Sequence, residues 1–553
     1  MKYMNMFNWW TTLFLLNSIS YMLISMKLLF TKKSFLMEWE IIKINSSEIY
    51  FSMIIDWMSM MFMSTVLLIS SMILLYSNEY MSTNKFESKR FISLINLFIL
   101  SMMMMIISPN LISIMIGWDG LGMISYCLVI FYSSKKSYNA GMITCLTNRI
   151  GDIALLISIS WMMSYGSWHF LFYKEIYKEF IIYMILSACF TKSAQMPFYS
   201  WLPEAMAAPT PISALVHSST LVTAGVYLSI RFINKMNMNN IMLLSILTTL
   251  MASICANYEF DLKKIIALST LSQLGLMMTS TFMGMKEMSF MHLITHATFK
   301  SLLFMCAGIM IFYSNNNQDI RNLGLTCSNL PMTSLCFSIS TMALCGMPFM
   351  SGFYSKDLIL ENMSISKMNM MSFLIMFLSL GLTVSYSTRT IYYLMKEKKL
   401  NLNIKLKKFN KMKMSMIVLT ILSTCLGSTL MWMMNLDLKI SIISKTLKIN
   451  PMIMILLGMW MGMEMFSFKK YYLNTKIYSF NSNMWNILKM LPKVKMNMLF
   501  MSFMFKKNLN TEWGEFIGAK GMSNFLTKSS KMMMLTKKKT FMLSIILWMT
   551  TMM

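Results

Sequence analysis

Charged residues are scarce in this chain, and their scarcity excludes a soluble globular protein. Asp, Glu, Lys and Arg make up 13% of the 553 residues, hydrophobic residues make up 56%, and the mean hydropathy is +0.56. Soluble domains carry roughly 25% charged residues. Apolar runs such as 6–30 and 110–132 reach the about 20 residues that a helix needs to cross a bilayer. We therefore expect an all-α polytopic membrane protein.

Acidic residues are scarcer than basic ones, with 22 Asp and Glu against 49 Lys and Arg and a formal net charge of +27. This balance alone could indicate a nucleic-acid partner. The hydropathy favours a membrane protein instead, so we expect no nucleic acid among its partners.

The sequence also lacks the patterns that hold cofactors. Its nine cysteines are scattered singly without a CxxC pair, no P-loop or glycine-rich dinucleotide motif is present, and histidines and cysteines form no cluster. We expect the chain to bind no metal, nucleotide or redox cofactor itself. The first 30 residues show no features of a cleaved signal or transit peptide.

Methionine, in contrast, is abundant. The chain has 73 methionines, many at positions where Ile or Leu would pack equally well, as in 102–105. This usage indicates a mitochondrial gene that reads AUA as methionine, a hypothesis that AUG at every methionine codon would contradict.

Hydropathy predicts fifteen membrane spans, two of them interrupted. The sixth contains Pro197 and Pro203, and the eleventh contains Pro348 between two glycines. Backbone freed by a broken helix is tolerated at membrane depth only where protein or a water-filled cavity satisfies it. The predicted spans are 6–30, 51–76, 91–107, 110–132, 141–165, 181–206, 211–233, 240–257, 262–284, 287–313, 331–362, 369–396, 411–434, 451–467 and 538–553.

Basic residues set the expected orientation. Loops that follow even-numbered spans hold more than twice as many Lys and Arg as the others, so they are expected on the matrix or cytoplasmic side. The largest basic segments are 396–413 and 469–537. In the second, Trp and Phe residues recur at helical spacing among lysines, which indicates an interfacial amphipathic helix broken near Pro492, followed by a terminal anchor. A merely basic tail is the alternative.

Ionisable residues within the spans are candidate functional residues, because each costs about 2.5 to 3.5 kcal/mol near the bilayer centre. His292, His296 and Lys300 are spaced four residues apart and share one helix face, with about 6 Å between successive rungs. Lys192 and Lys356 each lie close to a helix break. The candidates are Asp119, Arg149, Asp152, Lys192, Glu204, His217, His292, His296, Lys300, Lys356 and Arg389.

Protonatable chains of this kind mark proton relays. Burial favours the neutral amine of a lysine, and an approaching acid restores the charged form. Asp119 could therefore switch Lys192 between a loaded and an unloaded state.

Structural roles compete with this interpretation for five candidates. Arg149 and Asp152 could form a static ion pair or a gate, Glu204 could cap the broken segment, and His217 alone could be a satisfied core histidine. Arg389 is expected to extend to the membrane surface.

Several motifs resemble the chain 5 family of mitochondrial NADH:ubiquinone oxidoreductase, respiratory complex I. The resemblance covers about residues 50–395, and the methionine-rich remainder is similar to arthropod members. The motifs are Gly117-Trp118-Asp119-Gly120, Asn148-Arg149-Ile150-Gly151-Asp152, Thr191-Lys192-Ser193-Ala194-Gln195-Met196-Pro197, Trp201-Leu202-Pro203-Glu204, His217-Ser218-Ser219, Asp261-Leu262-Lys263-Lys264, Thr295-His296-Ala297-Thr298-Phe299-Lys300 and Ser355-Lys356-Asp357.

The resemblance implies an antiporter-like, proton-translocating subunit of the inner mitochondrial membrane. Two inverted five-helix repeats, 108–235 and 236–396, would follow N-terminal helices in 1–107. Further helices in 397–468 and a lateral helix with an anchor in 469–553 would complete the chain. Asp119, Lys192, His217, Lys300 and Lys356 would be path residues, and Asp357 a secondary one. Position 119 is Asp where the family usually has Glu, and the family has sixteen spans.

The resemblance also implies partners and cofactors. Flavin mononucleotide, iron–sulfur clusters and ubiquinone would be bound by other subunits of the complex. Neighbours would include the adjacent antiporter-like subunit, accessory subunits and lipids such as cardiolipin. Two other interpretations stay open: a sodium/proton antiporter subunit of the same fold, and a structural strap without its own proton path.

Overall fold

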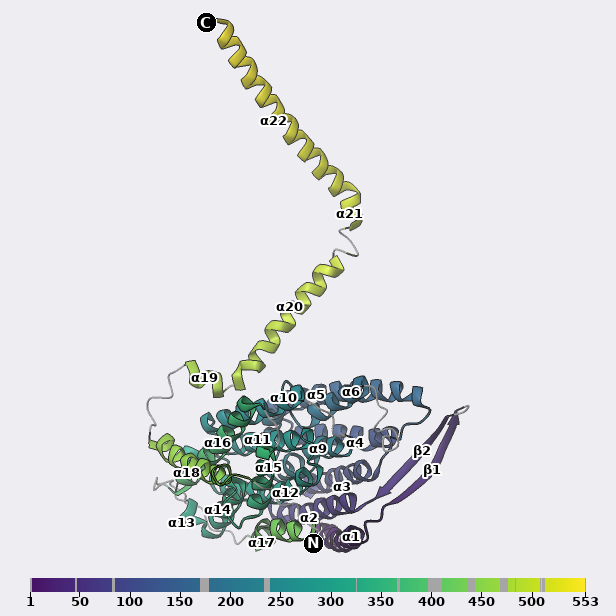
Figure 1. The fold of residues 1–553 in the computed structure, drawn as a ribbon, viewed down its shortest axis with the longest axis vertical. Helices are drawn as coiled ribbons and strands as arrows, with labels where there is room; N and C mark the ends of the chain where they lie inside the picture. The colour runs from purple at the N-terminus through teal and green to yellow at the C-terminus, as the bar shows by residue number, and fades with distance from the viewer. Residues whose placement is uncertain are drawn as a thin grey trace. The chain divides into compact units, whose positions relative to one another are not determined.

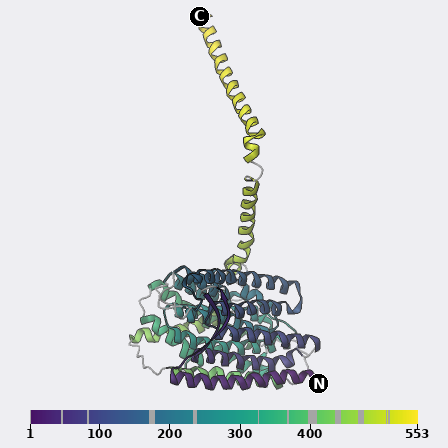
Figure 2. The same ribbon diagram turned by 90° about the vertical axis from the view of Figure 1, so that its right-hand side faces the viewer.

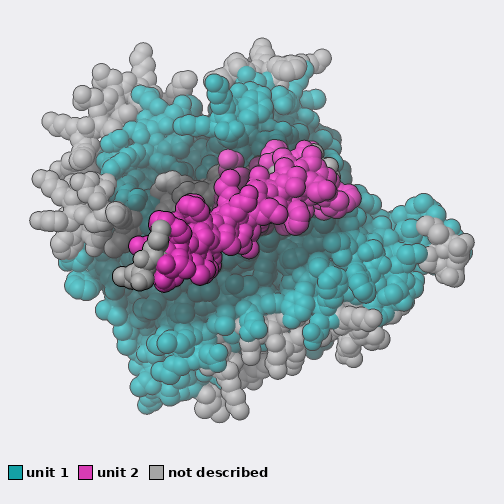
Figure 3. Space-filling view, turned by 90° about the horizontal axis from the view of Figure 1, so that it is seen from above, with its two compact units in different colours: residues 1–485 teal, residues 486–553 magenta. Residues whose placement is uncertain are grey.

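The computed structural model of the chain divides into two compact units, 1–485 and 486–553, coloured separately in Figure 3. The structure describes residues 2–44, 47–81, 85–169, 179–232, 239–324, 326–365, 369–395, 410–434, 443–467, 476–482, 484–507, 509 and 513–552.

Unit 1 is a bundle of long helices that lie side by side in both ribbon views (Figures 1 and 2). Its uninterrupted long helices are α1 (Lys2–Thr31), α2 (Trp57–Tyr80), α3 (Lys85–Ile107), α4 (Leu111–Val129), α5 (Lys135–Met162), α10 (Asn239–Tyr258), α11 (Leu262–Phe282), α12 (Lys286–Tyr313), α16 (Met370–Met395), α17 (Asn410–Met434) and α18 (Lys445–Ser467).

Three further spans of unit 1 are interrupted or distorted, and short turns connect the rest. The first is α6 (Glu179–Lys192) followed by α7 (Trp201–Glu204); the second is α8 (Thr210–Leu215), the π-helix η4 (Val216–Thr220) and α9 (Leu221–Phe232); the third is α14 (Pro331–Cys345) followed by α15 (Ser351–Ile365). The short elements are η1 (Ile130–Tyr132), η2 (Met163–Tyr165), η3 (Ala205–Ala207), η5 (Ile320–Asn322), α13 (Thr326–Asn329), α19 (Lys476–Ser482) and η6 (Met484–Asn486).

The predicted all-α membrane architecture is confirmed. Twelve helical segments among the described residues are long and apolar enough to cross a membrane. The two predicted broken spans add α6 with α7 and α14 with α15. In the part of the chain that the structure describes, therefore, fourteen of the fifteen predicted spans correspond to spans or broken spans of unit 1.

The hydroxyls of serine and threonine inside these helices donate hydrogen bonds to backbone carbonyls of the preceding turn. Ser64 donates to the Met61 carbonyl at 2.7 Å, and Ser70 donates to the Leu67 carbonyl at 2.9 Å. The same bond recurs along most helices of the bundle. Because a bilayer core offers no water to an exposed hydroxyl, this back-bonding lets serine and threonine occupy spans without a partner on another helix.

Small residues allow neighbouring helices to approach closely. A Cβ atom at Gly275 of α11 would lie 2.4 Å from a methyl carbon of Thr249 on α10, and one at Gly458 of α18 would lie 2.4 Å from the Gly381 carbonyl on α16. Close backbone approach is how membrane helices gain packing energy, since lipid tails are as apolar as leucine.

One feature of the N-terminal region was not predicted. Residues 51–55, expected to begin the second span, belong to an antiparallel hairpin of β1 (Phe35–Ile44) and β2 (Ser47–Ile55), so that span begins only at Trp57. Periodicity cannot assign a short apolar run to helix or strand, and only pairing with the partner strand decides. The Asn110 amide, which donates to the Tyr50 carbonyl at 3.0 Å, ties the hairpin to the start of α4.

His169 strengthens this attachment. Its Nε2 lies 3.6 Å from a Glu38 oxygen on β1. Burial lowers the pKa of His169, and the Glu38 charge opposes that effect only in part. The imidazole is therefore neutral at neutral pH, and its contact with Glu38 is a polar contact and not an ion pair.

Unit 2 contains α20 (Ile487–Lys507), α21 (Trp513–Ile517) and α22 (Ala519–Met552). Two predictions for this region are wrong. The helix does not break at Pro492, because α20 continues through it to Lys507. The last helix begins at Ala519, not near residue 538, and three lysines at 537–539 keep it from being as apolar as the other spans.

The structure brings loops predicted to lie on one membrane side into direct contact. Leu262 donates its backbone N–H to the Gln318 carbonyl at 2.9 Å, and Ile320 donates to the Phe260 carbonyl at 3.0 Å. Both loops follow even-numbered spans. The basic segment 396–413 itself lies outside the described residues up to 409.

Sidedness can be tested with two exposed lysines. We expect Lys264→Cys, next to the loop at 258–262, to react with an impermeant thiol reagent only from the basic side of sealed membranes. Lys43→Cys, on the hairpin, should react only from the other side. Labelling of both from one side would contradict the orientation.

Candidate functional site

Lys192 occupies the last position of α6, where the helix stops. The following residues form no helix until Trp201, and Ala194 has φ +52°. The lysine is fully buried, and its Nζ donates to the Trp118 carbonyl of α4 at 3.2 Å. The Nζ also lies 4.8 Å from the centroid of the Trp118 ring. This places a basic group beside backbone that has left the helical hydrogen-bond ladder, as predicted.

Trp118 connects this lysine to a carboxylate. Its indole N–H donates to Asp152 on α5 at 2.9 Å, and Asp152 also pairs with Arg149 at 3.4 Å. The Arg149 side chain is half exposed. The predicted Arg149–Asp152 pair thus exists, and its acid is held by the same tryptophan that holds Lys192.

Asp119 does not pair with Lys192 in this structure. Among the described residues no carboxylate lies within 4 Å of the Lys192 amine, and one Asp119 oxygen is buried without a hydrogen-bond partner. Asp119 nevertheless follows Trp118 directly on α4, so the predicted partner is a neighbour that does not make contact in the state described.

His217 lies in the π-helix η4, a distortion that is frequent at functional sites. Its ring is buried 6.1 Å from the Trp201 ring, which belongs to the segment after the break. Neither ring nitrogen has a hydrogen-bond partner among the described residues. Glu204, half buried at the end of α7, lies in that same segment.

The ladder on α12 has the predicted geometry. His292, His296 and Lys300 are all fully buried, and the two imidazole centroids are 6.3 Å apart. The Nδ1 of His292 hydrogen-bonds the Ser355 hydroxyl at 2.8 Å, and Lys300 donates to the Ser269 hydroxyl of α11. Both nitrogens of His296 are without a partner among the described residues.

Lys356 lies beside the second break. Between α14 and α15, Gly346 and Phe349 have φ values of +80° and +68°, and the Lys356 amine reaches back to donate to the Leu344 carbonyl in the last turn of α14. Asp357 follows it, half buried. The Ser355–His292 hydrogen bond joins this broken helix to the ladder.

Several buried polar atoms in and around these clusters have no hydrogen-bond partner among the described residues. Since buried polar groups in proteins are nearly always hydrogen-bonded, ordered water is the expected partner. The atoms concerned include an oxygen of Asp119, both nitrogens of His217, Oε1 of Gln273, Nε2 of His292, both nitrogens of His296, Oγ of Ser351 and the hydroxyl of Tyr386.

Sequence reasoning missed the neutral residues of the site. Trp118, Ser269 and Ser355 carry no charge, and serines occur throughout the spans, so nothing in the sequence distinguishes them. The Gly-Trp-Asp-Gly motif was the one available signal for Trp118.

The expectation for Arg389 is wrong. Its side chain does not extend to the membrane surface but is buried, where Nη2 donates to the carbonyls of Ala256 and Glu259. The guanidinium lies 5.5 Å from the Phe260 ring centroid, and Arg321 lies 4.3 Å from that centroid. The carbonyl oxygens that bind Arg389 come from the 256–260 turn, and their position could not be predicted from the sequence.

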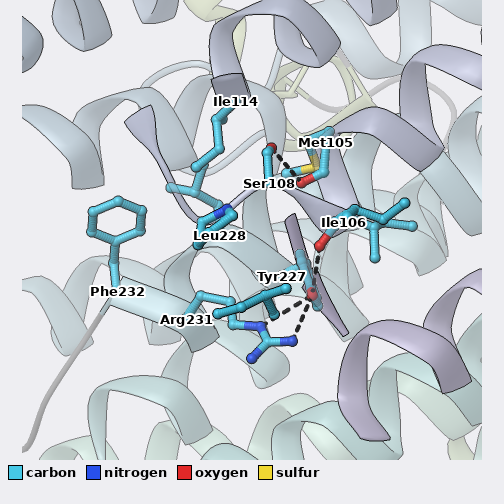
Figure 4. A pocket seen from close by; sticks show the side chains of 11 residues that line it. Met105, Ile106, Ser108, Ile114, Tyr227, Leu228, Arg231 and Phe232 are labelled. Carbon is cyan, nitrogen blue, oxygen red and sulfur yellow. Dashed lines mark hydrogen bonds between the residues drawn. The ribbon is translucent and has the colours of Figure 1, made fainter. Parts of the chain in front are cut away.

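A pocket outside these clusters is lined in part by Arg231 and Tyr227, whose mutual hydrogen bonds are drawn in Figure 4. Arg231 contacts Asp56 at 2.6 Å and donates to the Tyr227 hydroxyl, which itself donates to the Ile106 carbonyl at 3.1 Å. This pair ties the end of the hairpin to α9 and α3. The pocket is lined by Ile54, Met105, Ile106, Ile107, Ser108, Pro109, Ile114, Tyr227, Leu228, Arg231 and Phe232.

Two broken helices each carry a buried lysine, and the second is hydrogen-bonded to a ladder of buried histidines on α12. This arrangement is that of an antiporter-like transmembrane subunit. The fold is similar to a chain in the structure of the Mrp complex from Dietzia sp. DQ12-45-1b, with a TM-score of 0.71 at 19% identity. That similarity covers 93% of this chain, which spans 60% of the other chain.

Sequence comparison identifies the family. Residues 108–383 match the model for NADH:quinone oxidoreductase/Mrp antiporter transmembrane regions, 39–92 the complex I chain 5 N-terminus, and 386–553 the NADH dehydrogenase subunit 5 C-terminus. NADH-ubiquinone oxidoreductase chain 5 of Anopheles gambiae is 46% identical over 96% of this chain and 95% of its own length. That of Locusta migratoria is 46% identical over 92% and 93%.

The chain belongs to the NADH-ubiquinone oxidoreductase chain 5 family. It is a proton-translocating membrane-arm subunit of complex I, the NADH:quinone oxidoreductase, in a mitochondrial membrane.

The Trp118–Asp152 bond can be tested by substitution. Trp118→Phe keeps the aromatic packing but leaves a buried carboxylate without its indole donor, which should cost roughly 2 kcal/mol of stability. We expect a lower thermal unfolding midpoint of the assembled complex. Trp161→Phe, at a tryptophan of α5 that is 45% exposed, is the control and should leave the midpoint unchanged.

Proposed function

We propose that protons cross this chain on Lys192, His217, His292, His296, Lys300 and Lys356, with Asp119 as the acid that controls Lys192. The observation that carries the proposal is shared by the three lysines. Each is buried, each amine donates to a neutral carbonyl or hydroxyl oxygen, and none has a carboxylate within 4 Å among the described residues.

A lysine amine bound only to neutral oxygens can gain or lose a proton without moving its side chain. A purely structural ammonium would be expected to pair with a buried acid, because an unpaired charge is expensive away from water. A neutral oxygen can accept from the amine or the ammonium alike, so a proton can arrive or leave while the lysine keeps its position.

The helix breaks and the unpartnered polar atoms support water-mediated transfer between these groups. Lys192 lies where α6 ends, and Lys356 donates to the Leu344 carbonyl at the second break, so both amines adjoin non-helical backbone that water can reach. His292 and His296 stand one turn apart on α12, a separation that one water can bridge. Together these features favour a continuous proton route over isolated buried charges.

The remaining candidates have supporting roles in this proposal. A chain of contacts links Lys192 to Trp118, Asp152 and Arg149. A shift of Asp152 would therefore change the position of Trp118, which binds Lys192. Glu204 lies between the first break and His217, and Asp357 adjoins Lys356 at the second. We assign them to gating or positioning.

The wider assignment follows the family. Transport would be driven by NADH oxidation and ubiquinone reduction on other subunits, which would hold flavin mononucleotide, iron–sulfur clusters and ubiquinone. The membrane would be the mitochondrial inner membrane, the gene mitochondrial, and the neighbours the adjacent antiporter-like subunit, accessory subunits and lipids such as cardiolipin. Residues 108–235 and 236–396 would form two repeats between the helices of 1–107 and 397–468.

Lys192 provides the main test. Lys192→Met keeps length and apolar bulk but removes the carrier, and Lys192→Arg keeps the charge but cannot release a proton at physiological pH. We expect both variants to assemble and both to lower the proton yield per NADH in reconstituted vesicles. A normal yield in assembled Lys192→Arg enzyme would end the carrier role for this residue.

The two competing functions have separate tests. If the chain exchanges sodium for protons, transport by the reconstituted complex will depend on sodium concentration, whereas the proton route predicts no dependence. If the chain is only a strap, Lys192→Met will pump normally once assembled.

Residues 469–553 are proposed to hold this subunit in the complex. Part of this segment is fastened to unit 1, where the Tyr199 hydroxyl donates to the Met484 carbonyl at 2.9 Å and the Tyr478 hydroxyl donates to the Tyr258 carbonyl at 3.2 Å. From residue 496 onward, the apolar side chains that the structure describes in unit 2 are exposed, which favours a partner surface that covers them.

Truncation after Lys469 tests that role. It removes the Tyr478 and Met484 hydrogen bonds and the exposed apolar helices but leaves every buried lysine in place. We therefore expect less assembled complex, with the proton-carrying residues intact. Native gels should show a complex of reduced abundance. A complete complex at normal abundance would contradict the proposal.

A further inference from the structure

Lys263 is a fourth buried lysine in unit 1, and neither the sequence nor the family comparison above gave it a role. It is the second residue of α11 and is 6% exposed. Its Nζ donates to the Ala208 carbonyl at 3.2 Å, and among the described residues no carboxylate lies within 4 Å of it. Its environment therefore matches that of Lys192 and Lys356.

Lys264, the next residue of α11, is solvent-exposed and provides a comparison for Lys263. Lys264 has a side chain that is 41% exposed and pairs with Asp261 at 3.5 Å. A basic residue at the start of α11 could thus reach solvent and an acid. Lys263 points inward instead, at the positive end of a helix where a cation is disfavoured.

The position of Lys263 links the protein surface to His217. Just above it, the 258–262 loop pairs with the loop at 318–320 on the basic side. Its partner, Ala208, ends the short helix η3, and the His217 ring lies next to the backbone of Ala205 at the start of η3. A 3₁₀-helix rises about 2 Å per residue, so about 6 Å of backbone separates Ala208, which binds Lys263, from Ala205, which lies beside His217. Bound water would complete the connection between the two side chains.

The ring nitrogens of His217 can accept a proton that comes from Lys263. Both its ring nitrogens are buried and have no hydrogen-bond partner among the described residues. The elements that carry them are neighbours, since α11 packs against α7, η3 and the π-helix η4 that contains His217.

We propose that Lys263 is the residue that accepts protons entering from the basic side and passes them to His217. The inference rests on the proton route proposed above and extends it to the surface. A proton from water at the loop binds the neutral Nζ and forms an ammonium. The ammonium then releases that proton through water to a His217 nitrogen, which restores the amine, and no electron moves.

A structural role is the competing explanation. The amine could simply cap the free carbonyl at the end of η3. Arginine can donate to that carbonyl as well as lysine can, but it cannot release a proton at physiological pH. The two roles therefore predict opposite results for Lys263→Arg.

The experiment compares four variants of the whole complex in vesicles: Lys263→Met, Lys263→Arg, Lys264→Met and Lys192→Met. Assembly, NADH oxidation and proton yield per NADH are measured for each. We expect both Lys263 variants to assemble, and to lower the proton yield to about the level of Lys192→Met. The exposed neighbour Lys264→Met should behave as the unmodified enzyme.

Each other outcome is decisive. A normal proton yield in Lys263→Arg would overturn the proposal and assign the residue to capping, as would loss of assembly in both Lys263 variants. If Lys192→Met lowers the yield while the Lys263 variants do not, this inference alone fails. If none of the lysine variants lowers the yield, the proton route itself fails.

Discussion

The demand that polar groups be satisfied away from water governs this structure. In a bilayer core an unpaired backbone group or charge costs several kcal/mol, so continuous helices with self-bonded serines and threonines form most of the bundle. The departures from that rule are concentrated. They occur at 193–200 and 346–350 and in the π-helix at 216–220, and each lies beside a buried lysine or histidine.

The breaks and the buried lysines depend on each other. Lys356 donates to the Leu344 carbonyl at the end of α14, Lys192 ends α6, and Lys263 takes the carbonyl that ends η3. A carbonyl freed from the helical ladder needs a donor, and an amine without an acid needs an acceptor. At Lys356 and Lys263 the amine and the carbonyl at a helix end satisfy each other, whereas Lys192 donates to the Trp118 carbonyl within α4.

Aromatic and guanidinium groups fasten the periphery to this centre. Trp118 holds both Lys192 and Asp152, and Arg231 joins the hairpin end to α9 through Asp56 and Tyr227. On the basic side, Arg321 and Arg389 both lie against Phe260, near the tyrosines that dock the segment before unit 2.

Hydropathy and spacing alone determined the membrane class, nearly all the spans, the two broken helices and the charged members of the candidate site, because each is a property of residues close together in the chain. The sequence misplaced the second span, since the hairpin needs pairing between strands. It also misread Arg389 and Pro492. Only the tertiary structure showed that Trp118 joins Lys192 to Asp152, that Asp119 stands apart, and that Lys263 points inward while Lys264 does not. Those facts depend on which helices pack together and which carbonyls their breaks leave free, and no local pattern records that.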